Sequence, residues 1–132
     1  MTRQDVELAR EGFQALADEG YEALLERAHP DFEMTTPAGL AAEPQTYRGR
    51  DGLRRWFTSF YEVMDDIQVE PDTYEDLGDG GVLVVATLRA TGQRSGLAAE
   101  QRSFMVITLA DGLMRRIEFY PDAASARGAA GA

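Results

Sequence analysis

The sequence has no cysteine and a single histidine, His29. The missing thiols exclude disulfide bonds, cysteine nucleophiles and thiolate metal sites, and one imidazole disfavours both multi-histidine zinc sites and Ser–His catalysis. His29 precedes Pro30 at an expected helix end, where a cation suits the helix dipole, so we interpret it as structural. No apolar run is long enough to span a bilayer, and the N-terminus is polar from its second residue. We therefore expect a soluble, cytoplasmic protein without a metal site.

Basic residues are scarce, because 13 arginines and no lysine stand against 23 acidic residues. The resulting net charge of −10 repels phosphate backbones and anionic lipid surfaces. We therefore expect neither a nucleic acid nor a membrane as partner. The acidic stretch at residues 65–79 lacks the regular ligand spacing and central glycine of a calcium loop, so we interpret it as solvated turns.

The length of 132 residues fits one domain. We assign residues 1–126 to it and 127–132 to a flexible tail, because the chain ends in the low-complexity stretch AASARGAAGA. Apolar spacing and turn residues predict two helices, a strand, a loop, a third helix and then a meander of four strands. A tight turn at Asp111–Gly112 joins the last two strands. This order indicates an α+β domain. The expected helices cover residues 2–19, 21–28 and 51–64, the strands 32–36, 67–76, 82–91, 99–109 and 113–120, and a loop 37–49.

The last expected strand carries a polar row. In MRRIEFYPD, residues 114–122, alternation places Arg116, Glu118 and Tyr120 on one face, with Ile117 and Phe119 on the other. The polar row can be solvated, as charged strand residues mostly are, or it can line a pocket.

Three motifs and the element order resemble a known family over residues 5–126. The stretches AHPDFEMTTPAG, YRGRDGLRRWFTSF and RRIEFYPD are similar to the SnoaL-like branch of the nuclear transport factor 2-like, or ketosteroid isomerase-like, superfamily. The resemblance implies a cone-shaped, cystatin-like α+β fold, with three N-terminal helices packed on a curved, mostly antiparallel sheet. It also implies a homodimer, and a pocket between sheet and helices in which polyketide ring closure, steroid isomerisation, epoxide hydrolysis or dehydration proceeds without a cofactor. With this fold, we expect the polar row to face the pocket, with Arg116 nearest the rim.

The family's catalytic residues carry over only in part. The ketosteroid isomerase-like base falls on Thr36, whose hydroxyl has too high a pKa for that role, and its two oxyanion donors fall on Phe13 and Arg102. The epoxide hydrolase-like constellation retains one acid, Glu118, while Thr87 and Arg89 stand at the other positions. A SnoaL-like cyclase needs an inward carboxylate, for which Glu118 is again the candidate.

We therefore expect Glu118 to move a proton and Arg102 to stabilise developing negative charge. The alternatives are an ion pair of Glu118 with Arg102 or Arg116, which would keep the carboxylate ionised, and an Arg102 paired near the strand end. Tyr47 either donates a hydrogen bond at the pocket mouth or caps the following helix, and Trp56 is core, pocket wall or both. The expected substrate-binding residues are Phe13, Met34, Thr36, Tyr47, Trp56, Phe60, Phe104, Arg116 and Tyr120.

Three functions follow from these residues. The first is a cofactor-free isomerase, cyclase or hydrolase acting on a small apolar carbonyl compound or epoxide. The second is a pocket that binds a small apolar molecule without chemistry, which the missing base at Thr36 favours. The third is a protein-interaction module that uses the open face of the sheet.

Overall fold

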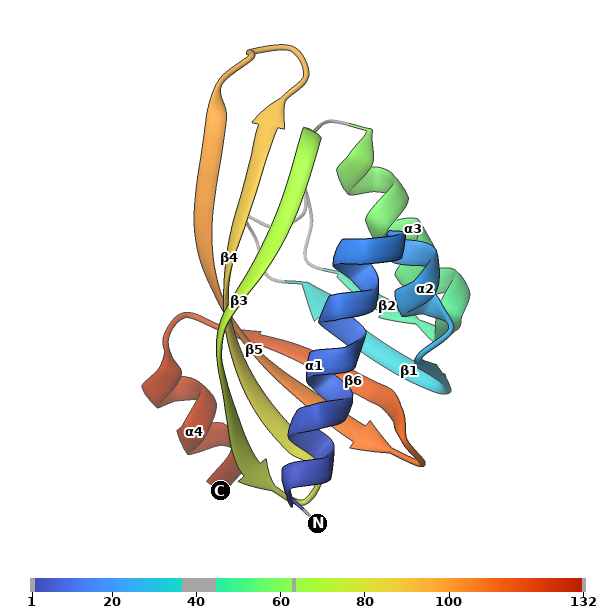
Figure 1. Ribbon diagram of the computed structural model, residues 1–132, viewed down its shortest axis with the longest axis vertical. Coiled ribbons are helices and arrows are strands. Elements are labelled where there is room, and N and C mark those ends of the chain that lie inside the picture. The colour runs from blue at the N-terminus through green and yellow to red at the C-terminus, as the bar shows by residue number, and fades with distance from the viewer. Residues whose placement is uncertain (1, 37–44, 63, 132) are drawn as a thin grey trace.

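A computed structural model describes residues 2–36, 45–62 and 64–131. Three helices cover one face of a single six-stranded sheet, and a fourth helix lies against the other face (Figure 1). The sheet order is β2-β1-β6-β5-β4-β3, and every neighbouring pair is antiparallel except β1 with β6. The predicted α+β class and curved, mostly antiparallel sheet are confirmed. The elements are α1 (Thr2–Glu19), α2 (Tyr21–Leu25), β1 (Ala28–Thr36), β2 (Gln45–Arg48), α3 (Gly49–Tyr61), β3 (Met64–Gly78), β4 (Gly81–Gly92), β5 (Ala98–Ala110), β6 (Leu113–Tyr120) and α4 (Ala123–Gly131).

The second helix is shorter than its apolar spacing predicts, because the chain joins the sheet at Ala28. Ala28 is fully buried and pairs with Met114, whose backbone N–H also donates to the Arg27 carbonyl. Pro30 lies inside β1 where the register with β6 is interrupted, between Ala28 and Glu33. The missing proline N–H therefore removes no regular ladder bond.

The strand β2 was not predicted. It spans only Gln45–Arg48, between Pro44 and Gly49, which made the segment resemble a loop. Tyr47 pairs with Met34 of β1, and both side chains are buried under α3. Pairing with an existing strand therefore supplies the stability that the short sequence lacks on its own.

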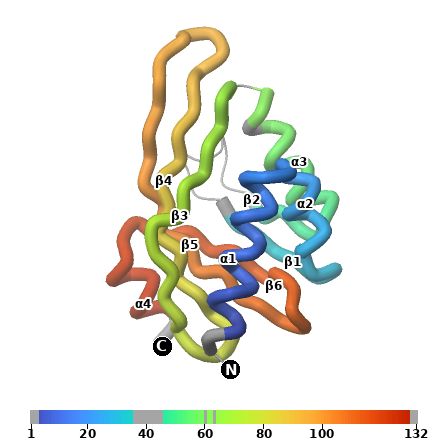
Figure 2. The backbone as a smooth tube through the Cα atoms, viewed as in Figure 1, coloured from blue at the N-terminus to red at the C-terminus, as the bar shows by residue number. Residues whose placement is uncertain are grey.

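The strands β3, β4 and β5 are long and bent. Three register irregularities interrupt the pairing of β3 with β4, and such bulges increase strand twist and bend. Figure 2 shows the three strands curving, with the turn between β4 and β5 reaching beyond the helices. The turn at Asp111–Gly112 is confirmed: both residues have positive φ, 55° and 76°, as a two-residue type I′ hairpin requires.

The C-terminal residues form a helix where the sequence predicts a frayed tail. The side chain of Ala126 is fully buried against Leu83, Val85 and Val106 on the outer face of the sheet. Asp122 caps the helix, since its Oδ1 accepts a hydrogen bond from the Ser125 N–H at 2.7 Å, and this bond lowers the pKa of Asp122. Arg127 adds two hydrogen bonds to Glu75 of β3, at 2.8 and 2.7 Å. Alanine content and capping, rather than an apolar stripe, thus produce α4.

Candidate functional site

A cavity lies between the helix-covered face of the sheet and the helices α1 and α3. Its volume is about 80 Å³, counted as the space that the centre of a water molecule can reach. One water needs about 10–15 Å³ on this measure, so a small organic molecule has room. The α1 side chains around it recur at helical spacing, from Ala9 through Phe13 to Leu16, and alternate residues of β3 to β6 form the opposite wall.

The cavity opens where α3 ends and β3 begins. At the far wall, Met34 and Ile107 are each 1% exposed, whereas Tyr61 at the end of α3 is 39% exposed. The nearby lining residues Ile67 and Leu88 are partly exposed as well. Tyr61 is the most exposed of the described lining residues, so the opening is assigned to its side of the cavity.

A glutamine from the β4–β5 turn fixes this opening. Gln93 Nε2 donates to the Tyr61 carbonyl oxygen at 2.9 Å and lies 3.2 Å from Asp65 Oδ1. The turn is thereby attached to the end of α3.

The lining is almost entirely apolar. Among the described residues, its side-chain hydrogen-bonding groups are the Tyr61 and Ser103 hydroxyls and the Trp56 indole N–H, and no lining side chain is charged. Burial, and secondarily the neighbouring Tyr21, raises the pKa of Tyr61 above its ordinary value. Its phenol therefore stays protonated at neutral pH and can donate a hydrogen bond.

Aromatic rings stabilise the α3 side of the cavity. Phe57 stacks on Tyr21 with ring centroids 5.1 Å apart, and Trp56 meets Phe57 edge-on at 4.9 Å. Tyr61 meets Tyr21 edge-on at 5.3 Å. Rings in these arrangements attract one another, so this wall is held in place without a ligand.

Some expected binding residues lie at this cavity. Phe13, Met34 and Trp56 line it. Tyr47 is buried behind Met34 and is not among the lining residues, and Arg55 lies over its ring at 5.8 Å. The side chains of Thr36 and Phe60 lie outside the described residues.

The prediction that the polar row of the last strand faces the cavity is wrong. Ile117 and Phe119 line the cavity, while Arg116, Glu118 and Tyr120 border a more open hollow of about 400 Å³ on the opposite face of the sheet. The helices α1 and α3 remove the inner face from water, and unpaired polar groups there would lose their hydration. The apolar row therefore faces inward.

A bulge in β6 moves Met114 into the inward row. Thr108 pairs with Arg116 and Leu109 with Met114, so Arg115 is an extra residue in β6. Met114 consequently lines the cavity together with Ile117, although simple alternation places it with the polar row. The apolar spacing Met114, Ile117, Phe119 was the available signal.

The outer hollow contains a small polar network. Tyr120 donates a hydrogen bond to Glu118 Oε2 at 3.3 Å, and burial, followed by the charge of Glu118, raises the pKa of Tyr120. Arg115 Nη1 is 3.7 Å from Glu33 Oε1. Among the described residues, no ion pair joins Glu118 to Arg102 or Arg116, so that alternative is wrong as well.

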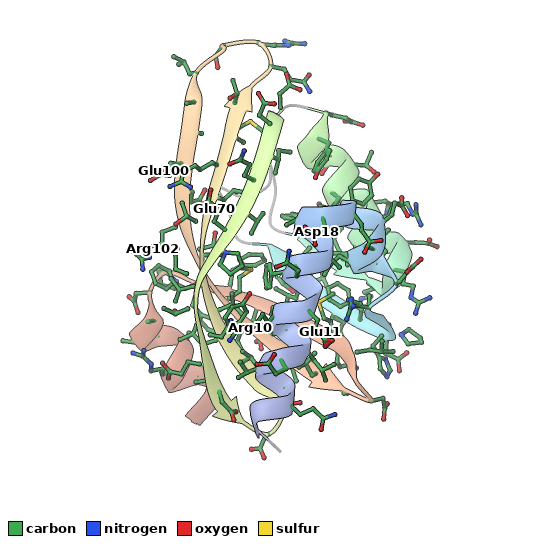
Figure 3. The ribbon with its side chains drawn as sticks, viewed as in Figure 1. Arg10, Glu11, Asp18, Glu70, Glu100 and Arg102 are labelled. Atoms are coloured by element: carbon green, nitrogen blue, oxygen red, sulfur yellow. The ribbon has the colours of Figure 1, made fainter. Side chains whose placement is uncertain are left out.

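Arg102 and Phe104 also belong to the outer face, because their β5 neighbours Ser103 and Met105 line the cavity. Figure 3 shows Arg102 pointing away from α1 and α3. Both expected catalytic residues therefore lie outside the cavity. Arg89, the other basic residue considered, is 2.6 Å from Glu70 and 2.9 Å from Glu100.

Neither metal ligation nor membrane spanning is indicated in the described part of the chain. It contains no group of three or more metal-ligating His, Cys, Asp or Glu side chains. His29 lies in β1 rather than at a helix end, with Nε2 3.4 Å from Asp111 Oδ2 and Nδ1 accepting from the Asp31 N–H. None of the described helices has the length and apolar character needed to cross a membrane.

Comparison with known proteins identifies the family. Residues 9–117 match the model of the SnoaL-like domain. The chain belongs to the SnoaL-like family. This SnoaL-like protein is also 32% identical over 125 residues to the uncharacterized protein Rv0034 of Mycobacterium tuberculosis, covering 92% of each chain. The predicted family is thereby confirmed.

Solved structures share the fold. TerC, co-crystallised with polyporic acid, superimposes with a TM-score of 0.78 at 23% identity, over 98% of this chain and 99% of TerC. RV0760c of M. tuberculosis, in complex with estradiol-17beta-hemisuccinate, gives 0.74 at 10% identity, over 92% and 95%. Proteins described as NTF2-like, or as having a ketosteroid isomerase-like fold, also match. The SnoaL-like protein thus has the nuclear transport factor 2-like architecture.

Proposed function

We propose that this SnoaL-like protein binds a small apolar molecule in the cavity between α1, α3 and the sheet. The observation that carries the proposal is the lining, which is apolar apart from the indole and two hydroxyls. Transfer of apolar surface from water into such a cavity is favourable by about 25 cal/mol per Å². A few convergent polar groups in an apolar pocket are typical of small-molecule sites.

Two proteins of the same fold support this proposal. TerC was crystallised with polyporic acid, and RV0760c with an estradiol derivative. Their low identity to this chain makes the likeness one of fold alone, so they support small-molecule binding by this fold and neither a particular place nor a particular ligand.

The lining favours binding over chemistry. A general base must lie within hydrogen-bond reach of the proton that it removes. None of the described lining residues carries a carboxylate, an imidazole or an amine, and Glu118 and Arg102 lie on the other face. We therefore place ligand binding ahead of an isomerase, cyclase or hydrolase activity.

A fluorescence titration tests the proposal. Trp56 is the only tryptophan and lines the cavity, so its emission reports a ligand beside α3. We expect a saturable change when small neutral carbonyl compounds or epoxides are added. Absence of saturable binding by any of them would refute the proposal.

Two neighbouring β5 positions provide the matched variants. Ser103→Leu fills the cavity and should weaken binding about tenfold or more, the equivalent of about 1.4 kcal/mol. Arg102→Leu adds the same side chain on the outer face and should leave affinity unchanged. Equal binding by both variants would place the ligand outside the cavity.

We also propose a homodimer, which rests on the family resemblance. Phe104 and Tyr120 are partly exposed apolar residues on the outer face next to α4, a surface that a second copy can cover. Sedimentation of the wild type should give twice the chain mass, and Phe104→Asp should give the monomer. A monomeric wild type at high concentration would refute the homodimer.

A further inference from the structure

The charge distribution around the cavity restricts the ligand class further. We infer that the cavity selects uncharged molecules and rejects carboxylates and ammonium ions of the same shape. The inference rests on the proposed function, because it concerns the ligand of the same cavity.

A buried carboxylate needs a cation or several donors to replace its hydration. No described side chain that lines the cavity is basic. Residues 37–44, which the structure does not describe, have the sequence PAGLAAEP and contain no Arg, Lys or His. This segment therefore adds no cation, wherever it lies.

Two arginines on the elements that form the cavity are engaged elsewhere. Arg89 of β4 is held on the outer face between Glu70 and Glu100, at 2.6 and 2.9 Å. Arg10 of α1 lies over the ring of Tyr74, 4.7 Å from its centroid, with Glu7 at 3.7 Å. A ligand carboxylate would have to compete with these contacts to obtain a cation.

Acidic residues at the opening repel anionic ligands. Glu62, Asp65 and Asp66 follow the end of α3, and all three are exposed. Arg94, next to Gln93 in the β4–β5 turn, offsets one of these charges, and the net charge of −10 leaves the potential at the entrance negative. Anions are therefore disfavoured before they reach the apolar lining.

Cations meet the opposite problem inside. The acidic opening attracts them, but no described lining residue is a carboxylate that could pair with a buried ammonium group; Glu43, the one carboxylate of residues 37–44, lies outside the described residues. The aromatic rings of the α3 wall pack on one another, with Phe57 contacting both Tyr21 and Trp56. They are arranged as a packed wall rather than as a cage around an ion.

Uncharged oxygens, in contrast, find suitable partners. The Tyr61 phenol can donate to a carbonyl or ether oxygen, and the Ser103 hydroxyl can donate or accept. The matching ligand is a neutral, mostly apolar molecule with one or two hydrogen-bonding oxygens.

Three probes of one skeleton test the inference. We would measure the affinities of 2-naphthamide, 2-naphthoate and 2-naphthylmethylammonium for the full chain by calorimetry at about pH 7.5, where the last two are charged. We expect the amide to bind and each ion to bind about a hundredfold more weakly. An ion that binds within about threefold of the amide would overturn the inference and leave the proposed binding function intact. If none of the three binds, the proposed function fails as well.

A pair of charge insertions adds an independent measurement. Leu88→Arg places a cation in the lining near the opening, so the affinity for 2-naphthoate should rise about tenfold or more. Leu97→Arg adds the same charge at an exposed position, 71% accessible, and should change nothing. An equal gain in both variants would mean that overall charge, rather than the missing partner in the cavity, excludes the anion.

Discussion

Glu118 and Phe119 are consecutive in β6 and face opposite sides of the sheet. Phe119 lines the cavity with Ile117, whereas Glu118 accepts a hydrogen bond from Tyr120 in the outer hollow. One peptide bond therefore separates the proposed ligand site from the polar face. Substitutions at these two positions should affect different properties of the protein.

The first prediction compares these neighbours. Phe119→Ala removes part of the cavity wall and should weaken ligand binding about tenfold, with a loss of about 2 kcal/mol in the free energy of unfolding. Glu118→Gln keeps the shape of the outer face and should leave affinity unchanged. Trp56 fluorescence titration and urea unfolding measure both effects. Loss of binding in Glu118→Gln would contradict this prediction and show that the polar row of β6 takes part in ligand binding.

The second prediction concerns two turn glycines with similar backbone angles. Gly80 has φ +82° and Gly112 has φ +76°. A Cβ at Gly80 would lie 2.6 Å from the Leu109 carbonyl oxygen, whereas nothing lies within 4 Å of one at Gly112. We expect Gly112→Ala to destabilise by about 1 kcal/mol from strain alone, and Gly80→Ala by about 3 kcal/mol because the backbone must also shift. Equal losses in urea unfolding would contradict the steric explanation.

The third prediction concerns the attachment of α4. Hydrogen bonds from Arg127 lower the pKa of Glu75 below its ordinary value of 4.5. A lowered pKa in the folded state means that this contact stabilises the protein above about pH 4.5 and is lost as the pH falls through the lowered pKa. Both groups are exposed, so we expect local rather than global unfolding on acidification.

Hydrogen exchange measures this effect residue by residue. Amides of residues 123–131 should exchange faster in Glu75→Gln than in the wild type at neutral pH, with no change in β1. Glu70→Gln, at another exposed position of β3, is the control. Unchanged exchange in Glu75→Gln would mean that Ala126 alone holds the helix.

The fourth prediction concerns Tyr61 at the opening. Burial and the neighbouring Tyr21 raise its pKa above 10.0. With a raised pKa, the protonated form is retained below pH 10.0, and the stability associated with it is lost only as the pH rises through the higher value. The difference in ultraviolet titration between wild type and Tyr61→Phe should therefore lie above pH 10.0. A component that titrates below that value would show that Tyr61 is solvated.

Sequence patterns predicted the fold where the chemistry is local. The turn at Asp111–Gly112 needs two residues that tolerate positive φ, and the four-strand meander follows from alternation between such turns. The missed strand β2 and the early start of β1 depend on partners elsewhere in the chain, Met34 for Tyr47 and Met114 for Ala28. Such pairings are invisible to a pattern read along the sequence.

The candidate site was only partly predictable for the same reason. The helical stripes predicted that Phe13 and Trp56 are buried, because their spacing requires a buried face, whereas their place at a pocket was an expectation from the family resemblance. The extra residue at Arg115 places Met114 in the inward row, whereas residues 116–120 alternate as predicted. The catalytic assignments to Glu118 and Arg102 depended on which face of β6 and of β5 points inward, which alternation alone does not decide, and they lost their support because the opposite faces line the cavity.

The parallel pairing of β1 with β6 affects how the chain folds during its synthesis on the ribosome. β1 is synthesised early, yet β6, one of its two neighbours in the sheet, is synthesised only after β3, β4 and β5. Until β6 is synthesised, Phe32 and Met34 have no strand on one side of them, although both are almost fully buried in the folded protein. Such distant contacts slow folding and expose apolar surface meanwhile. A nascent chain that stalls before β6 therefore has its first strand paired on one side only, with β2, and leaves apolar surface exposed on the other side.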